Sequence, residues 1–131
     1  MNREGENREG ENREGNERSA LLVGGDLMAR ARLEAAASAA GVALHTASPE
    51  GLGEALRAAP ARWLILDLDQ GRRAALDALV RARADGLVPE RVVGYFSHVD
   101  EELGRAARAA GCEALPRGRF WRTLPELFGA P

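Results

Sequence analysis

Polar residues of types that support chemistry stand where strands are expected to end. Asp67 and Asp69 follow one apolar run, and Ser97 follows a second. Arg117 and Arg119 come after a third. Carboxylates bind Mg²⁺, and an arginine guanidinium pairs with phosphate or carboxylate as a fork. Sites in parallel sheets form where the strands end, so Asp69 could face the same crevice as Asp67.

Two of the strand tips are better explained as helix starts. Gly24-Gly25-Asp26 could bind an anion at a helix N-terminus, but it lacks dinucleotide-binding spacing and a phosphate-loop lysine. We interpret it as a tight turn whose Asp26 caps the next helix. After the later tip, Ser97 or Asp100 is expected to cap the helix that follows.

The elements that position these residues alternate regularly along the chain. Apolar runs predict strands at 20–23, 42–46, 63–66, 91–96 and 112–115. Helical patterns follow at 26–40, 48–59, 73–84, 100–110 and 120–128. Strands that are apolar throughout are buried on both faces. With right-handed crossovers they predict a three-layer α/β/α sandwich around one five-stranded parallel sheet.

The first 18 residues are a charged repeat unlike the rest of the chain. Residues 2–18 read NREGENREGENREGNER, with 4 Arg and 6 Glu. A period of five fits neither a helix nor a strand, and no apolar side chain could dock the segment. We predict a low-complexity tail at 1–18 and one folded domain at 19–131. A charged arm that binds a partner or a second copy is the alternative.

Composition argues against several classes of protein. A net charge of −2 disfavours a nucleic-acid binder and a polybasic membrane anchor. No apolar run approaches the roughly 18 residues that span a bilayer, and nothing predicts export, so we expect a cytoplasmic protein. The single cysteine, Cys112, excludes an internal disulfide framework. For His45 and His98 we expect neither a metal-binding nor a catalytic role.

The order of the strand tips resembles the receiver domain of two-component response regulators. The best match is Leu64-Ile65-Leu66-Asp67-Leu68, because the aspartate ending this strand accepts a phosphoryl group in that family. Ser97 lies near the family's phosphoryl-contacting Ser or Thr, and Leu115-Pro116-Arg117 lies where receivers carry Lys-Pro. The resemblance covers residues 20–128 and implies a flavodoxin-like fold with strand order 2-1-3-4-5.

The departures from the receiver pattern concern its metal site. Receivers place two adjacent acidic residues after the first strand to hold Mg²⁺, and here Gly24 and Gly25 stand there, followed by Asp26. The family's lysine is replaced by Arg117 or Arg119. Phosphoryl transfer depends on charge neutralisation, with the metal a major contributor. A site without the acidic pair should therefore bind Mg²⁺ poorly.

These departures lead to a hypothesis of a non-catalytic pseudo-receiver, a signalling or scaffold module. It is not an enzyme, needs no cofactor, and binds a protein partner or a second copy as a homodimer. The alternative is an Mg²⁺-dependent phosphoacceptor at Asp67, with Asp26, Asp69, Ser97 and Arg117 as neighbours of the phosphoryl group. A weaker alternative is a protein that binds a small anionic ligand in the loops at the strand ends, formed by residues 24–26 and 117–119.

The densest aromatic patch lies near the C-terminus. Phe120, Trp121 and Leu124, with Leu127 and Phe128, are spaced to pack one helix face on the sheet. Two adjacent aromatic residues cannot both point inward, so either Phe120 or Trp121 should be partly exposed. In receivers the face formed by the last two helices and the last strand is the usual dimer or partner surface. Phe120, Trp121 and Leu124 are therefore the predicted interaction surface.

Overall fold

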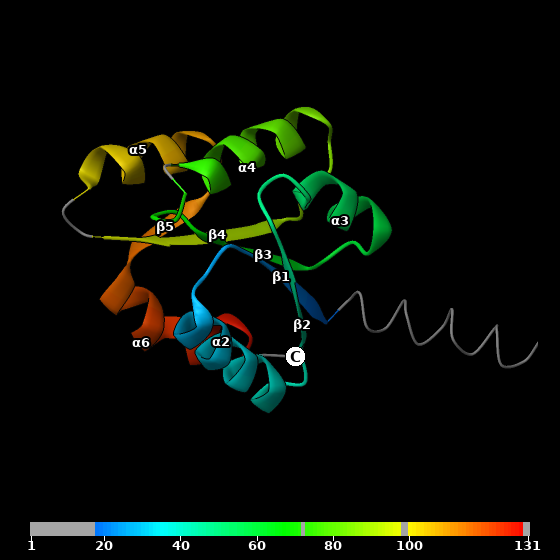
Figure 1. Cartoon of the computed structure of the whole chain (residues 1–131). Coiled ribbons are helices and arrows are strands. Elements are labelled where there is room, and N and C mark those ends of the chain that lie inside the picture. Colours follow the sequence, from blue (N-terminus) through cyan, green and yellow to red (C-terminus); the bar gives the residue numbers. More distant parts are fainter. Residues whose placement is uncertain (1–17, 72, 98–99, 130–131) are drawn as a thin grey trace, which may run out of the picture.

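A five-stranded parallel sheet runs through the middle of the protein (Figure 1). The structure is a computed structural model that describes residues 18–71, 73–97 and 100–129. The strand order is β2-β1-β3-β4-β5, which confirms the predicted order and the flavodoxin-like class. The strands are β1 (Ser19–Val23), β2 (Ala43–Ala47), β3 (Trp63–Asp67), β4 (Arg91–Phe96) and β5 (Glu113–Pro116).

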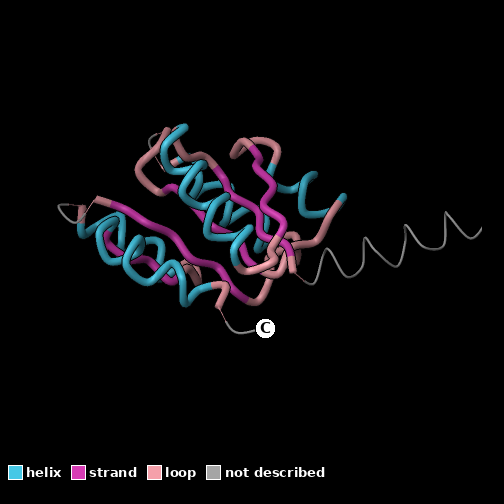
Figure 2. The backbone as a smooth tube through the Cα atoms, turned by 90° about the horizontal axis from the view of Figure 1, so that it is seen from below, coloured by secondary structure: helices cyan, strands magenta, loops and turns pink. Residues whose placement is uncertain are grey.

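Helices cover both faces of the sheet and complete the predicted three layers. The helices of the described residues are α2 (Leu27–Ala39), α3 (Leu52–Ala58), α4 (Ala74–Ala84), α5 (Glu101–Ala109) and α6 (Arg117–Leu127). Figure 1 shows α3, α4 and α5 on one face and α2 and α6 on the other. Figure 2 looks at the molecule from the side that carries α2 and α6.

The central strands divide their side chains between two cores. Leu64 and Leu66 of β3 pack with the residues under α3, α4 and α5. Ile65, between them, packs with the residues under α2 and α6. Every residue of β1 and β3 is buried, because successive strand side chains point to opposite faces and both faces are covered.

Two helix starts differ from the sequence-based expectation. Residues 48–51 form a turn in which Ser48 Oγ accepts a hydrogen bond from the Gly51 N–H at 3.1 Å, and α3 begins only at Leu52. Conversely, α6 begins at Arg117, directly after Pro116 ends β5. The first turn of α6 holds Arg117, Gly118 and Arg119, which carry no apolar signal, so periodicity alone placed the start at Phe120.

The first strand begins directly after the charged repeat in the sequence. β1 begins at Ser19, and the Arg18 Nη2 donates a hydrogen bond to the Ala40 carbonyl at 2.6 Å. The remainder of the predicted tail, residues 1–17, lies outside the described residues, as does His98. In the described part of the chain, no helix combines the length and apolarity that crossing a membrane requires.

Candidate functional site

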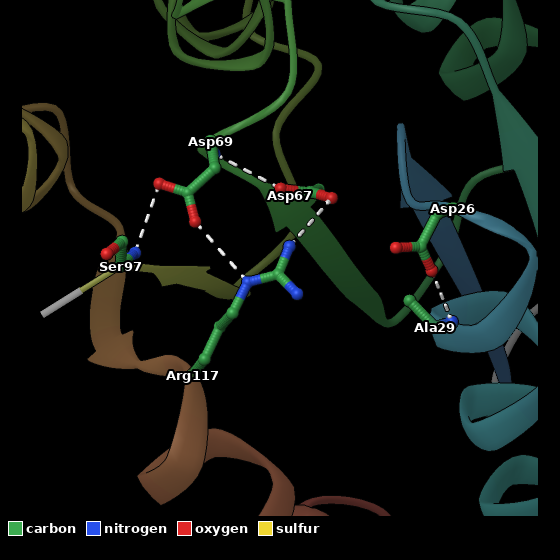
Figure 3. A network of polar contacts seen from close by, with 6 residues as sticks. All are labelled: Asp26, Ala29, Asp67, Asp69, Ser97 and Arg117. Carbon is green, nitrogen blue, oxygen red and sulfur yellow. Dashed lines mark hydrogen bonds and ion pairs between the residues drawn. The ribbon is translucent and has the colours of Figure 1, made fainter.

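Four of the five predicted site residues meet at the carboxyl ends of the strands. Asp67 is the last residue of β3, Asp69 lies in the loop after it, and Ser97 follows β4. Arg117 is the first residue of α6, directly after β5. Figure 3 shows the side chains of Asp67, Asp69 and Arg117 turned toward one another and the backbone nitrogen of Ser97 facing Asp69, whereas Asp26 is turned toward its own helix. The structure thus brings the residues of three strand tips into one polar network.

Asp67 is the buried member of this network. The residue is 2% exposed. Its Oδ1 accepts a hydrogen bond from the Asp69 N–H at 3.1 Å, and its Oδ2 lies 3.6 Å from Arg117 Nη2. Burial raises the pKa of the Asp67 carboxyl above its ordinary value, and the nearby Arg117 charge offsets only part of this effect. Asp67 is therefore a desolvated carboxylate with a distant ionic partner.

Asp69 joins the three loops at this edge of the sheet. Its Oδ1 accepts a hydrogen bond from the Ser97 N–H at 3.0 Å, and its Oδ2 accepts one from Arg117 Nε at 3.4 Å. Ser97 thus contributes its backbone N–H to the network. One carboxylate holds the loop after β3 against the end of β4 and the start of α6, so it fixes the position of the guanidinium beside Asp67.

Arg117 supplies the positive charge of the site. Its guanidinium forms ion pairs with both Asp67 and Asp69, at 3.6 and 3.4 Å. The sequence left Arg117 and Arg119 as equal candidates, and the structure distinguishes them. Arg119 lines a hollow of about 290 Å³ between the sheet edge and α6, together with Arg91, Glu113 and Glu126. The cation that faces Asp67 is therefore Arg117.

Asp26 caps a helix, as the sequence predicted. Its Oδ1 accepts a hydrogen bond from the Ala29 N–H at 2.8 Å, at the start of α2. Such a bond satisfies one of the free donors of the first helical turn. Asp100 caps α5 in the same way, accepting from the Leu103 N–H at 3.1 Å. The Asp26 carboxylate is thus engaged in the helix and does not take part in the Asp67 network.

Gly24 and Gly25, which form the turn before Asp26, both adopt a left-handed backbone conformation. Gly24 and Gly25 have φ angles of +81° and +86°, where any side chain is strained. A Cβ on Gly24 would lie 2.7 Å from Gln70 Oε1, and a Cβ on Gly25 would lie 3.1 Å from Leu22 Cδ2. The backbone angle is therefore the main obstacle to an acidic side chain here, because the end of the Gln70 side chain can move aside and Leu22 would have to shift by only a few tenths of an ångström.

These residues do not fit the divalent cation that the fold family implies. Mg²⁺ requires carboxylate ligands in near-octahedral geometry. The two positions that carry the acidic pair in receivers are Gly24 and Gly25 here, and Asp26 caps a helix. The Arg117 guanidinium already forms ion pairs with Asp67 and Asp69. Across residues 18–71, 73–97 and 100–129, no three His, Cys, Asp or Glu side chains gather in a group that could hold a metal ion.

Tyr95 is a site residue that the sequence analysis missed. It pairs with Asp67 in the register of β3 and β4, and it is completely buried. Among the described residues its hydroxyl makes no hydrogen bond of ordinary geometry, although the side chain of Asp67 lies close enough to act on it, and the Arg117 guanidinium lies 5.2 Å from its ring centre. Burial raises the pKa of the Tyr95 phenol, and the Asp67 charge adds to this effect. The signal that could have found Tyr95 is its position at the end of a strand adjacent to β3.

The predicted interaction surface is largely interior. Phe120 and Leu124 are 1% and 5% exposed and belong to the core under α2 and α6. Trp121 is partly exposed, which confirms the expectation for this adjacent aromatic pair. The guanidinium of Arg32 from α2 lies 4.3 Å from the Trp121 ring centre. Of the three residues, Trp121 alone presents substantial surface.

The sheet order and the placement of Asp67 define a receiver-type fold. Among solved structures, the chain is similar to the receiver domain of TorR, the response regulator of the TMAO respiratory system. The TM-score is 0.67 at 16% identity, over 83% of this chain and 94% of that one. It is also similar to NtrX from Brucella abortus, with a TM-score of 0.62 at 20% identity, over 84% of this chain. This chain covers 27% of the NtrX chain.

The likeness extends to the fold and not to the sequence. Neither a family model nor a curated protein sequence matches this chain. At identities of 16% and 20%, the solved structures establish the architecture alone. The chemistry has to be argued from the site.

Proposed function

We propose that this protein is a pseudo-receiver, a signalling or scaffold module that works through protein contacts without phosphorylation or a cofactor. The observation that carries the proposal is the Arg117 guanidinium, which forms ion pairs with both Asp67 and Asp69. An internal cation of the chain thus pairs with the strand-end carboxylate and compensates part of its charge.

Access to Asp67 supports this proposal. The side chain of Asp67 is 3% exposed, and its two oxygens face the Asp69 N–H and Arg117. A phosphoryl group could reach the carboxylate only after the guanidinium had moved away. That movement would break both ion pairs and would leave Asp67 buried without its cation, which is costly.

Charge balance supports the proposal independently. The network contains the carboxylates of Asp67 and Asp69 and one guanidinium. Phosphorylation of Asp67 would replace its single carboxylate charge by close to two negative charges on the phosphoryl group, so it would add about one negative charge to the network. Phosphoryl transfer proceeds mainly by positioning and charge neutralisation, and Gly24 and Gly25 provide no ligands for a compensating metal.

The alternative is phosphorylation at Asp67, favoured by its position at the end of a central strand with Ser97 close by. The anion-binding alternative has less support, because its two arginines lie in different surroundings and one of them is already paired. Arg117 is paired with carboxylates, and Arg119 lines a hollow with two glutamates and Arg91.

The decisive experiment is phosphorylation by a small-molecule donor. The full chain is incubated with acetyl phosphate and MgCl₂ and weighed intact, with Asp67→Asn as the control. We expect no mass gain in either protein. A stable gain of one phosphoryl group that disappears in Asp67→Asn would refute the proposal and establish the phosphoacceptor. A Mg²⁺ titration followed by tryptophan fluorescence should likewise show no saturable change.

A further inference from the structure

The two edges of the sheet differ in their protection against pairing with another strand. At one edge, β5 contains Glu113, which forms an ion pair with Arg91 at 3.2 Å, and Pro116, which has no N–H to donate. At the other edge, β2 reads Ala-Leu-His-Thr-Ala, with neither a proline nor a carboxylate. Charged residues and proline are the usual protection of an edge strand. The β2 edge lacks both.

Two residues of β2 direct their backbone N–H and C=O groups away from the sheet, toward the open edge. The Ala43 N–H donates to the Arg18 carbonyl at 3.0 Å, and the Ala47 carbonyl accepts from the Gly24 N–H at 3.4 Å. Both bonds point toward β1. Because backbone groups alternate in direction along a strand, the N–H and C=O groups of Leu44 and Thr46 point away from the sheet.

Two opposite charges of α2 lie beside this edge. Arg30 and Glu34 line a hollow together with Leu44, His45 and Thr46. Within the described residues, neither charge forms an ion pair. α2 connects two parallel strands and therefore runs antiparallel to them. Arg30 then lies toward the Thr46 end of β2, and Glu34 lies toward the Leu44 end.

We propose that two copies of this chain pair antiparallel along β2, with the two-fold axis at His45, and form one continuous ten-stranded sheet. In this register Leu44 of each copy exchanges two backbone hydrogen bonds with Thr46 of the other. The four residues from Arg30 to Glu34 span about 6 Å along the helix, and the two residues from Leu44 to Thr46 span about 6.6 Å along the strand, so the two spacings match. The same axis therefore places Arg30 of each copy opposite Glu34 of the other.

A self-complementary patch of this kind is what a two-fold dimer requires. The free backbone groups and the α2 charges independently select the same register, which favours a second copy over an unrelated strand. The inference deepens the proposed function by naming the partner. Its test does not involve Asp67, so either proposal can fail while the other holds.

The first test exchanges the charges and measures the molar mass of the full chain by sedimentation. The unmodified chain should dimerise as its concentration rises. In the proposed dimer, residue 30 of each copy faces residue 34 of the other, so there are two such contacts. Arg30→Glu and Glu34→Arg each put like charges at both contacts, and each should raise the dissociation constant of the dimer roughly tenfold. An equimolar mixture of the two variants should form a heterodimer, because both contacts again join opposite charges. Arg81→Glu, on exposed α4, is the matched control and should dimerise normally.

The second test removes a backbone donor. Thr46→Pro deletes an outward N–H that the fold of the single copy does not use, so the variant should keep its circular dichroism spectrum and remain monomeric. A chain that stays monomeric at its highest soluble concentration would overturn the inference. So would a dimer that persists in Thr46→Pro, or variants of Arg30 and Glu34 that fail to associate when mixed.

Discussion

Replacing Asp67 by asparagine should make the protein more stable at neutral pH. Asp67 is buried, and its compensation for desolvation comes from the backbone N–H groups of Asp69 and Gln70 and from a guanidinium 3.6 Å away. Asparagine has nearly the same shape, and its carbonyl oxygen can still accept the bond from the Asp69 N–H. The substitution removes the desolvated charge and leaves the packing intact.

The magnitude follows from the balance of two effects. Burial raises the pKa of Asp67, and the attraction of Arg117 does not fully cancel this rise. Because the Arg117 side chain is 41% exposed, its attraction is screened by solvent. Replacing a buried charge whose partner is screened in this way by a neutral group of the same shape is commonly stabilising by about 1 kcal/mol or more. We therefore expect Asp67→Asn to gain about 1 kcal/mol, or about 4 °C in melting temperature for a domain of this size.

The gain should depend on pH in a defined direction. The pKa of Asp67 is raised on folding, so its ionisation disfavours the folded state. The unmodified protein loses this part of its stability as the pH rises through the pKa of the folded state. Below the ordinary carboxyl value of 3.8, Asp67 is protonated in both states, and the two proteins should be equally stable.

Urea unfolding from about pH 3 to about pH 8 tests this prediction. The control is Asp85→Asn, because Asp85 also pairs with an arginine, at 3.5 Å, but in solvent. It should change the free energy of unfolding by less than about 0.5 kcal/mol. A loss of stability in Asp67→Asn at neutral pH, or a difference that does not vary with pH, would refute the reasoning about the site.

Three further predictions concern single side chains. Asp26→Ala should lower the free energy of unfolding by about 1 kcal/mol, because it removes the cap of α2; an unchanged value in urea unfolding would argue against the cap. Tyr95→Phe should be neutral or stabilising by up to about 1 kcal/mol, because the buried hydroxyl makes no hydrogen bond of ordinary geometry with the described residues; a clear drop in melting temperature would reveal a hydrogen bond. Burial raises the pKa of the Cys112 thiol to about 12, so a thiol reagent at about pH 8 should label it only after unfolding, and rapid labelling of the folded protein would contradict this.

Local signals were sufficient to predict the architecture. The run from Trp63 to Leu66 is apolar at every position, which is typical of a strand covered on both faces, and helices with caps or stop signals separate such runs. Asp26 was predicted as a cap, and Ser97 or Asp100 as another, because a cap depends only on residues a few positions away; the structure shows Asp26 and Asp100 in these roles. The start of α6 was missed because its first turn lacks apolar residues.

The site was less predictable because its contacts join distant segments. Tyr95 enters it through the strand register that pairs it with Asp67, which no local pattern encodes. The choice of Arg117 over Arg119 depends on where α6 begins, since a shift along the first helical turn redirects the side chain. The role of Asp69 was indicated by its spacing from Asp67, but its bond to the Ser97 N–H is a property of the folded loops.

The paired left-handed glycines have a consequence for the evolution of this domain. An acidic residue at either position meets an unfavourable backbone angle, and at position 25 it also meets Leu22. Each substitution alone would cost about 1–2 kcal/mol before any metal affinity could compensate. Installing an acidic pair at these two positions would therefore require several simultaneous changes, including one that releases Arg117 from Asp67 and Asp69. Single substitutions along that route would each lower stability before a metal could bind.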